Sequence, residues 1–168
     1  FRRIIFGGMI SLLLASIMIL SNIRPVRTSP STITVPDDYS TIQEAINHAD
    51  EGDTIFVRNG TYFENIIVNK TLTLVGEESA ATIVNGNRKE FVVSITRSDV
   101  KVEGFTFCNT NMFNSSGFGI IAYNVTNCLI QRNILHSNYC GIRLSSCINS
   151  KIINNNIESN LIGIIFEF

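Results

Sequence analysis

The sequence carries the stretch Gly119-Ile120-Ile121-Ala122, which returns as Gly141-Ile142-Arg143-Leu144 and again as Gly163-Ile164-Ile165-Phe166. Each return comes 22 residues after the last. A repeat of this length indicates a solenoid or another stacked array, because one unit of that size cannot bury its own apolar face. Other positions in the period match as well: Asn127 with Asn149, Ile130 with Ile152, Asn133 with Asn155, Leu135 with Ile157, Ser137 with Ser159, and Asn138 with Asn160.

The apolar residues within one repeat lie two positions apart, as Ile142 and Leu144 do. A period of two is typical of a β-strand, whose side chains alternate between its two faces. Clusters of Ser, Asn and Cys separate these pairs and indicate turns. Three short strands and three turns account for a unit of about 22 residues. We therefore predict an all-β chain that forms a parallel β-helix, and not a leucine-rich repeat, whose fixed leucines and helical segment are absent.

Stacking of such coils would place each residue about 4.8 Å from its equivalent in the neighbouring coil. Asn133 should then lie beside Asn155 in a buried ladder of side-chain amides. Ile130 should contact Ile152 in an apolar ladder. Since no coil can bury its inner face alone, the stack itself should supply the stability.

The repeat continues toward the N-terminus with a longer period of 28 residues. The six additional residues fit in the turn from Asn109 to Phe118, and we count about four coils including partial ones. The aligned pairs are Val92 with Ile120, Ser94 with Ala122, Val100 with Cys128, Val102 with Ile130, Phe107 with Leu135, Leu72 with Val100, Leu74 with Val102, and Gly76 with Gly104.

The N-terminal residues 1–23 place Arg2 and Arg3 before an uncharged apolar run. This pattern predicts a secretory signal peptide. An uncleaved membrane anchor is the alternative, since the run approaches the roughly 20 residues that span a bilayer. Either reading predicts an exported chain, periplasmic, extracellular or at the cell surface, with membrane contact only through this segment.

The rest of the chain divides into a linker over residues 24–35, with room for a short strand at 32–35, and a β-helix domain over residues 36–168. The domain stops after one strand of a new coil, so we expect it to be truncated at its C-terminus. The segment from Ser40 to Ala49 predicts an N-terminal capping α-helix, with Ser40 and Gln43 at capping-box spacing. Its apolar face comprises Ile42, Ala45, Ile46 and Ala49.

The composition excludes some classes of function. Lys and Arg number 13 against 14 Asp and Glu, so the chain lacks the basic surface of a nucleic-acid-binding protein. We expect a monomer. The 4 cysteines show no CxxC spacing, which argues against zinc and favours buried thiols. The sequence does not decide whether Cys128 and Cys147 form a disulfide.

The opening of the domain resembles a known family. The stretches are Tyr39-Ser-Thr-Ile-Gln-Glu-Ala-Ile46, Gly52-Asp-Thr-Ile-Phe-Val-Arg-Asn-Gly-Thr-Tyr62 and Leu72-Thr-Leu-Val-Gly76. They are similar to the N-terminal part of right-handed parallel β-helix proteins of the pectin lyase-like superfamily, near pectin methylesterases and the NosD-type proteins with their PbH1 repeats. The resemblance implies the fold and the right-handed winding but not an activity, because lyases, esterases, hydrolases and surface proteins share this opening.

No complete active site is predicted within these residues. A glycosidase needs two carboxylates on one face, yet Glu103 aligns with Gln131 and Ile153 rather than with another acid. No cofactor is predicted. Whether the chain binds Ca²⁺ or copper is left open. A copper site would use Cys108 and His136, which align in one outward column with Glu158.

Candidate binding and modification residues come from two patterns. Aromatic side chains can stack on sugars, and insertions on one edge of a solenoid often form its binding face. Sequons of the form Asn-x-Ser/Thr permit N-glycosylation in an exported chain. The aromatic candidates are Phe113, Phe118, Tyr123 and Tyr139, and the sequon asparagines are Asn59, Asn69, Asn114 and Asn124.

Three functional hypotheses follow. The first is an exported β-helix module that binds a polysaccharide or cell-surface glycan, or serves as a surface scaffold, without catalysis in this segment. The second is the front part of a carbohydrate-active lyase or esterase whose catalytic residues lie in further coils. The third is a NosD-like accessory protein that handles copper.

Overall fold

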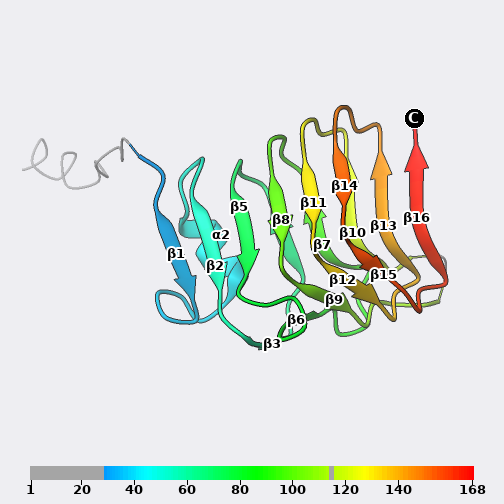
Figure 1. The fold of residues 1–168 in the computed structure, drawn as a ribbon, viewed down its shortest axis with the longest axis horizontal. Helices are drawn as coiled ribbons and strands as arrows, with labels where there is room; N and C mark the ends of the chain where they lie inside the picture. The colour runs from blue at the N-terminus through cyan, green and yellow to red at the C-terminus, as the bar shows by residue number, and fades with distance from the viewer. Residues whose placement is uncertain (1–28, 114–115) are drawn as a thin grey trace, which may run out of the picture.

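A computed structural model describes residues 29–113 and 116–168, and these wind into a solenoid of three parallel sheets (Figure 1). Sheet A comprises β1 (Thr32–Val35), β2 (Thr54–Val57), β5 (Thr73–Gly76), β8 (Lys101–Glu103), β11 (Leu129–Gln131) and β14 (Lys151–Ile153). Sheet B comprises β3 (Gly60–Tyr62), β6 (Thr82–Asn85), β9 (Thr106–Cys108), β12 (Ile134–His136) and β15 (Asn156–Ile157). Sheet C comprises β4 (Ile66–Val68), β7 (Phe91–Ile95), β10 (Phe118–Tyr123), β13 (Cys140–Ser145) and β16 (Ile162–Glu167).

Every coil contributes one strand to each sheet, which confirms the predicted parallel β-helix. The described residues hold five coils with all three strands, one more than the sequence indicated, because the coil of β2, β3 and β4 lacks the repeat pattern. Residues 1–23, predicted as signal or anchor, lie outside the described part. No helix among the described residues has the length and apolar character needed to cross a membrane.

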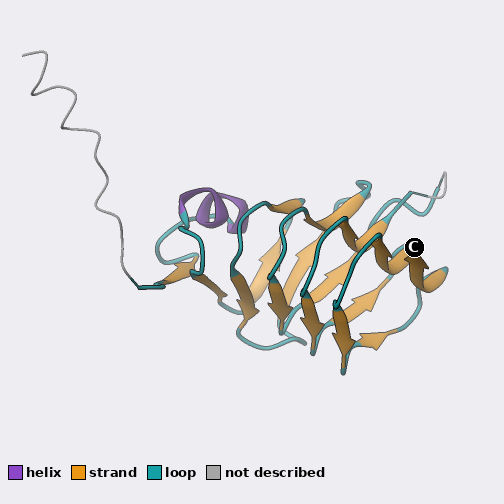
Figure 2. Ribbon diagram, turned by 90° about the horizontal axis from the view of Figure 1, so that it is seen from above, coloured by secondary structure: helices purple, strands orange, loops and turns teal. Residues whose placement is uncertain are grey.

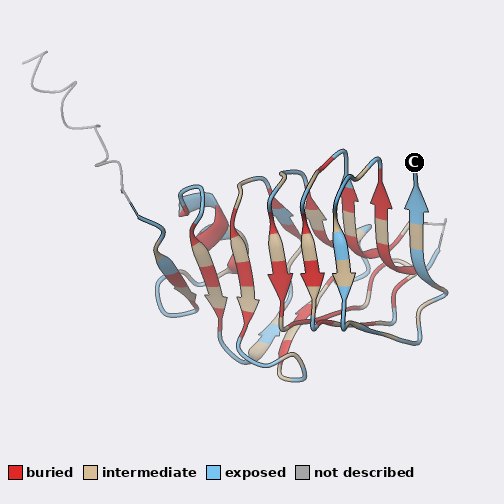
Figure 3. Cartoon of the chain, turned by 45° about the horizontal axis from the view of Figure 1, so that its top comes forward, coloured by how far each residue is buried: buried red, intermediate tan, exposed pale blue. Residues whose placement is uncertain are grey.

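Equivalent apolar residues stack in register through the whole solenoid. Ile130 pairs with Ile152 and Leu135 with Ile157, as predicted. Buried side chains therefore recur at the same level of successive strands (Figure 3). One such ladder in sheet A comprises Ile33, Ile55, Leu74, Val102, Ile130 and Ile152.

The predicted alignment is wrong by one residue in part of sheet C. Ile120 pairs with Val93 rather than Val92, and Ala122 pairs with Ile95 rather than Ser94. The reason is one additional residue on the way to sheet A: six residues, 123–128, lie between Ala122 and Leu129, against five, 96–100, between their partners Ile95 and Lys101. Val102 and Ile130 beyond these segments resume the predicted spacing.

Asn133, which is buried, and Asn155, which is half-buried, form the predicted ladder at the corner between sheets A and B. Asn133 is 1% exposed, and its Nδ2 donates to Asn155 Oδ1 over 3.1 Å and to the Val102 carbonyl over 3.1 Å. The Asn133 Oδ1 accepts the Phe105 N–H over 3.1 Å. Asn133 thus bonds both a strand carbonyl and a turn N–H of the coil before it.

A second asparagine ladder, at the corner between sheets B and C, ends at the inserted loop. The Asn138 N–H donates to Asn160 Oδ1 over 3.0 Å, and Asn138 Nδ2 donates to the Phe107 carbonyl over 3.1 Å. The Asn138 Oδ1 is buried and has no partner among the described residues. Nine residues, 109–117, separate β9 from β10, against three, 137–139, between β12 and β13, which confirms the predicted six-residue insertion.

Helix α2 (Ile42–His48) lies beside the first coils (Figure 2), with Ile42, Ala45 and Ile46 buried as predicted. Its N-cap is Thr41, whose side chain accepts the Glu44 N–H, and not Ser40. A Thr41/Glu44 pair therefore replaces the predicted Ser40/Gln43 box.

Two side chains satisfy strand edges at the N-terminal end. The Gln43 side-chain amide accepts the Ile67 N–H over 2.7 Å and donates to the Ile67 carbonyl over 3.3 Å, in the manner of a neighbouring strand. The Asp38 carboxylate accepts the Thr34 N–H over 2.7 Å. Thr34 belongs to β1, which lies in the segment predicted as a linker and is paired along its length with β2.

Candidate functional site

The candidate site is the outer face of sheet C beside the inserted loop. Odd-numbered positions of β10 and β13 point away from the core, whereas Ile120 and Ile142 are fully buried. Parallel pairing therefore aligns an outward row of five residues across the sheet. This outward row comprises Ile67, Ser94, Ile121, Arg143 and Ile165.

Arg143 organises the polar part of this face. Its Nη2 donates to both carboxylate oxygens of Glu167, over 2.9 and 2.7 Å, and Ser145 Oγ donates to Glu167 Oε2 over 2.6 Å. The hydrogen bonds from Ser145 and Arg143 lower the pKa of the Glu167 carboxyl. The Arg143 guanidinium carbon lies 5.2 Å from the centre of the Phe118 ring, within cation–π range.

The four predicted aromatic residues differ in accessibility. Phe113 in the inserted loop is 77% exposed, and Tyr123 at the end of β10 is 68% exposed. Tyr139 is half-buried. Phe118 is only 7% exposed and the Arg143 guanidinium lies over its ring, so little of this ring is accessible to a sugar.

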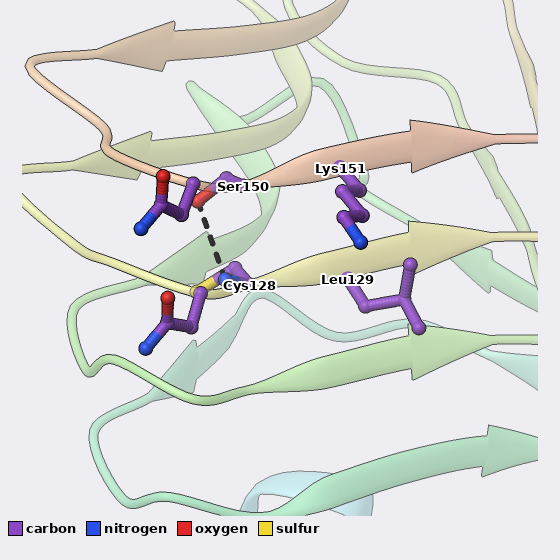
Figure 4. A pocket seen from close by; sticks show the side chains of 6 residues that line it. Cys128, Leu129, Ser150 and Lys151 are labelled. Carbon is purple, nitrogen blue, oxygen red and sulfur yellow. Dashed lines mark hydrogen bonds between the residues drawn. The ribbon is translucent and has the colours of Figure 1, made fainter.

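A hollow of about 610 Å³ lies at the adjoining corner between sheets C and A (Figure 4). Ser150 Oγ accepts the Cys128 N–H there over 3.2 Å. Lys151 and Leu129 stand on neighbouring coils, as the close view shows. The lining offers amides, a hydroxyl and an ammonium group but no carboxylate: Asn127, Cys128, Leu129, Asn149, Ser150 and Lys151.

Comparisons with known proteins agree with this fold. No protein-family model matches the chain. It is 35% identical over 102 residues to a cell surface glycoprotein of Methanothermus fervidus, a match that covers 59% of this chain and 16% of that protein. It is 35% identical over 107 residues to pectinesterase/pectinesterase inhibitor 22 of Arabidopsis thaliana, a match that covers 58% of this chain and 18% of that protein.

A solved structure completes the comparison. A pectin methylesterase mutant in complex with a hexasaccharide matches with a TM-score of 0.51 at 15% identity, over 74% of this chain and 48% of that one. The chain has the pectin lyase-like parallel β-helix fold. This β-helix spans less than a fifth of either relative found by sequence.

The copper candidates of the β-helix lie in adjacent coils, since Cys108 pairs with His136 in sheet B. Cys108 is not outward-exposed as predicted but 7% exposed. Burial raises the pKa of its thiol, which opposes the thiolate that a soft metal prefers. Within the described ranges, no group of three or more His, Cys, Asp or Glu is placed to hold a metal ion. Binding of copper or Ca²⁺ stays a prediction.

The other cysteines are free thiols too. Cys128 and Cys140 are buried and Cys147 is half-buried, so the disulfide left open between Cys128 and Cys147 is absent. Burial raises the pKa of the Cys128 and Cys140 thiols. These groups behave as small core residues rather than nucleophiles.

A charged cluster on the outer face of sheet A was not predicted as a unit. Glu103 bonds Lys101 over 2.7 Å, Gln131 over 2.6 Å, and Arg132. Burial raises the pKa of the Glu103 carboxyl, but the hydrogen bonds from Lys101 and Gln131 outweigh it and lower that pKa overall. The predicted alignment of Glu103 with Gln131 is confirmed. Its adjacency to Arg132 was not apparent, because Arg132 lies in a turn rather than in the strand.

Proposed function

We propose that this β-helix is an exported module that binds a polysaccharide or cell-surface glycan on the outer face of sheet C. The observation that carries the proposal is the exposure of two aromatic rings, Tyr123 at the end of β10 and Phe113 in the inserted loop that precedes this strand. Arg143, Ser145 and Glu167 add hydrogen-bonding groups on the same face. A surface of this kind can stack on sugar rings and bond their hydroxyls.

The relatives support an extracellular, carbohydrate-related setting. One is named as a cell surface glycoprotein and the other as a pectinesterase, and the solved β-helix was crystallised with a hexasaccharide. Catalysis is not part of the proposal. Glu167 is the only acidic residue in β4, β7, β10, β13 and β16, so the strands of this face lack a carboxylate pair.

We also infer two structural features of the module. The coils wind in the right-handed sense, as parallel crossover connections do. Helix α2 serves as the N-terminal cap, because it covers the apolar end with Ile42 and Ile46 while Gln43 occupies the edge of β4.

The experiment is a glycan-binding measurement on the purified chain, using an array of acidic and neutral plant and microbial polysaccharides. Phe113→Ala and Tyr123→Ala should each weaken retention by about tenfold, since an aromatic stacking contact contributes about 0.5–1.5 kcal/mol beyond its buried area. Phe63→Ala is the matched control, because Phe63 is 68% exposed but lies in the coil of β3 and β4. Absence of retention on every glycan, or an equal effect of Phe63→Ala, would refute the proposal.

A further inference from the structure

Three of the four sequons lie within the described residues, and their surroundings differ. Asn59, Asn69 and Asn124 are all exposed, so exposure does not distinguish them. What differs is whether the asparagine amide and the hydroxyl two residues later are already bonded. Both groups belong to the acceptor motif of N-glycosylation.

Asn124 has both groups available. It follows β10 directly with φ of 52°, a left-handed turn conformation that asparagine tolerates. Its N–H donates to the Ser145 carbonyl over 2.9 Å, which fixes the turn. Within residues 29–113 and 116–168, neither the Asn124 side-chain amide nor the Thr126 hydroxyl makes a hydrogen bond.

In each of the other two described sequons, one side-chain group is already hydrogen-bonded. Asn59 Oδ1 accepts the Thr82 hydroxyl over 3.1 Å, and its sequon continues into β3, which pairs with β6. The Thr71 hydroxyl of the Asn69 sequon donates to the Ser98 carbonyl over 3.0 Å. An enzyme would have to break these contacts before it could bind either acceptor.

We propose that Asn124 is the preferred N-glycosylation site among the described sequons of the folded β-helix, with a lipid-linked oligosaccharide as the donor. In the transfer, Asn124 Nδ2 forms a bond to C1 of the first sugar and loses one proton. The bond between that carbon and the phosphate oxygen breaks, and the polyprenyl diphosphate leaves with its electron pair. The side-chain carbonyl is retained, and no oxidant or reductant is needed.

The location of Asn124 gives the modification a physical consequence. The turn lies at the corner between sheets C and A, next to the exposed ring of Tyr123. A glycan there adds a polar, bulky group to the edge of the solenoid. It leaves the backbone ladders untouched, because Asn124 contributes only its main chain to them.

The test incubates the purified, folded chain with a single-subunit oligosaccharyltransferase that accepts plain Asn-x-Ser/Thr, together with a polyprenyl-diphosphate oligosaccharide. Glycopeptide mass spectrometry then gives the occupancy of each site. We expect the Asn124 peptide to carry the glycan, and the Asn59 and Asn69 peptides to remain largely unmodified. Thr126→Ala should abolish the Asn124 glycopeptide, and Thr126→Ser should restore it.

Thr126 is the residue to vary, because its hydroxyl makes no hydrogen bond among the described residues whose loss would disturb the fold. The matched control is Asn59→Gln, which removes the Asn59 sequon instead. The occupancy of Asn114, which lies outside the described residues, is measured separately and does not enter the comparison. An unmodified Asn124 peptide, or equal occupancy at Asn59 and Asn124, would overturn the proposal. Glycan binding of the unmodified chain is a separate readout, so failure of either proposal leaves the other testable.

Discussion

At the scale of single residues, the asparagine side chains show how the turns of the solenoid are satisfied. Asn133 uses both ends of its amide, bonding Phe105, Val102 and Asn155. Asn138 occupies the equivalent role at the next corner, but its Oδ1 has no partner among the described residues. A buried amide is therefore fully hydrogen-bonded in this fold only where the coil on each side supplies a matching group.

Replacement of Asn133 by alanine should destabilise the chain by about 1–3 kcal/mol. The variant leaves the buried Phe105 N–H without its acceptor, and an unsatisfied buried group costs about 1–3 kcal/mol. The Val102 carbonyl loses one donor but stays within the ladder between β8 and β11. Urea unfolding followed by circular dichroism measures the change. Asn156→Ala is the control, since Asn156 is exposed and should change stability by at most about 0.5 kcal/mol. Equal effects of the two substitutions would show that the ladder does not stabilise the stack.

At the scale of elements, the two N-terminal strand edges show how a solenoid avoids further strand addition. An exposed edge presents free N–H and C=O groups that can pair with another chain. The Gln43 side chain of α2 bonds the edge groups of Ile67 in β4, and the Asp38 carboxylate accepts the edge N–H of Thr34 in β1. Glu64 in turn accepts the Ile42 and Gln43 N–H groups at 3.0 Å each, which holds the start of the helix in place.

The Gln43→Ala variant should associate more readily than the parent chain. Its loss of folding stability should be small, about 0.5–1.5 kcal/mol, because water can replace the side chain at the exposed Ile67. The freed edge, however, becomes available to a second molecule. Light scattering over time at fixed concentration measures association. Ser40→Ala, which loses only an exposed contact to Glu44, should behave as the parent does; no difference between these variants would argue against an edge-protecting role for α2.

At the scale of the whole molecule, the inserted loop 109–117 interrupts a regular stack at one corner. It separates the regular coils at the C-terminal end from the more divergent coils before it, and it carries the exposed Phe113. The same loop ends the Asn138 ladder. The proposed binding surface therefore lies beside a buried side-chain amide whose Oδ1 accepts no hydrogen bond from the described residues. Such local irregularity at a functional surface is common in otherwise consistent folds.

Exchange of residues 109–117 for the three-residue turn Ser-Asn-Tyr, a copy of 137–139, should raise stability and abolish glycan binding. The copied asparagine would supply the N–H that Asn138 Oδ1 lacks, worth about 1 kcal/mol. The urea midpoint and glycan retention are measured on the same preparation. Phe113→Ala in the intact loop should weaken retention by about tenfold without the gain in stability. A loop exchange that retains binding would place the site elsewhere.

Much of the fold could be predicted because the repeat expresses one physical rule, that like residues stack on like. Ile130 on Ile152 and Asn133 on Asn155 followed from the period alone. The error at Val92 arose because the path from sheet C to sheet A is one residue longer after Ala122 than after its partner Ile95, and a period does not reveal where an additional residue lies. The N-cap was misplaced for a similar reason, since Ser40 and Thr41 are both good caps and only geometry chooses between them.

The sequence by itself determined the period, the strand faces and the sites of candidate residues, because these depend on the order of residues along one chain. Only the tertiary structure decided which candidates are accessible. Phe118 and Cys108 are buried although Phe113 and Tyr123 are exposed, since burial depends on what the neighbouring coils and loops place over each side chain. The availability of Asn124 and Thr126 was decided in the same way, by hydrogen bonds between residues that lie far apart in the sequence.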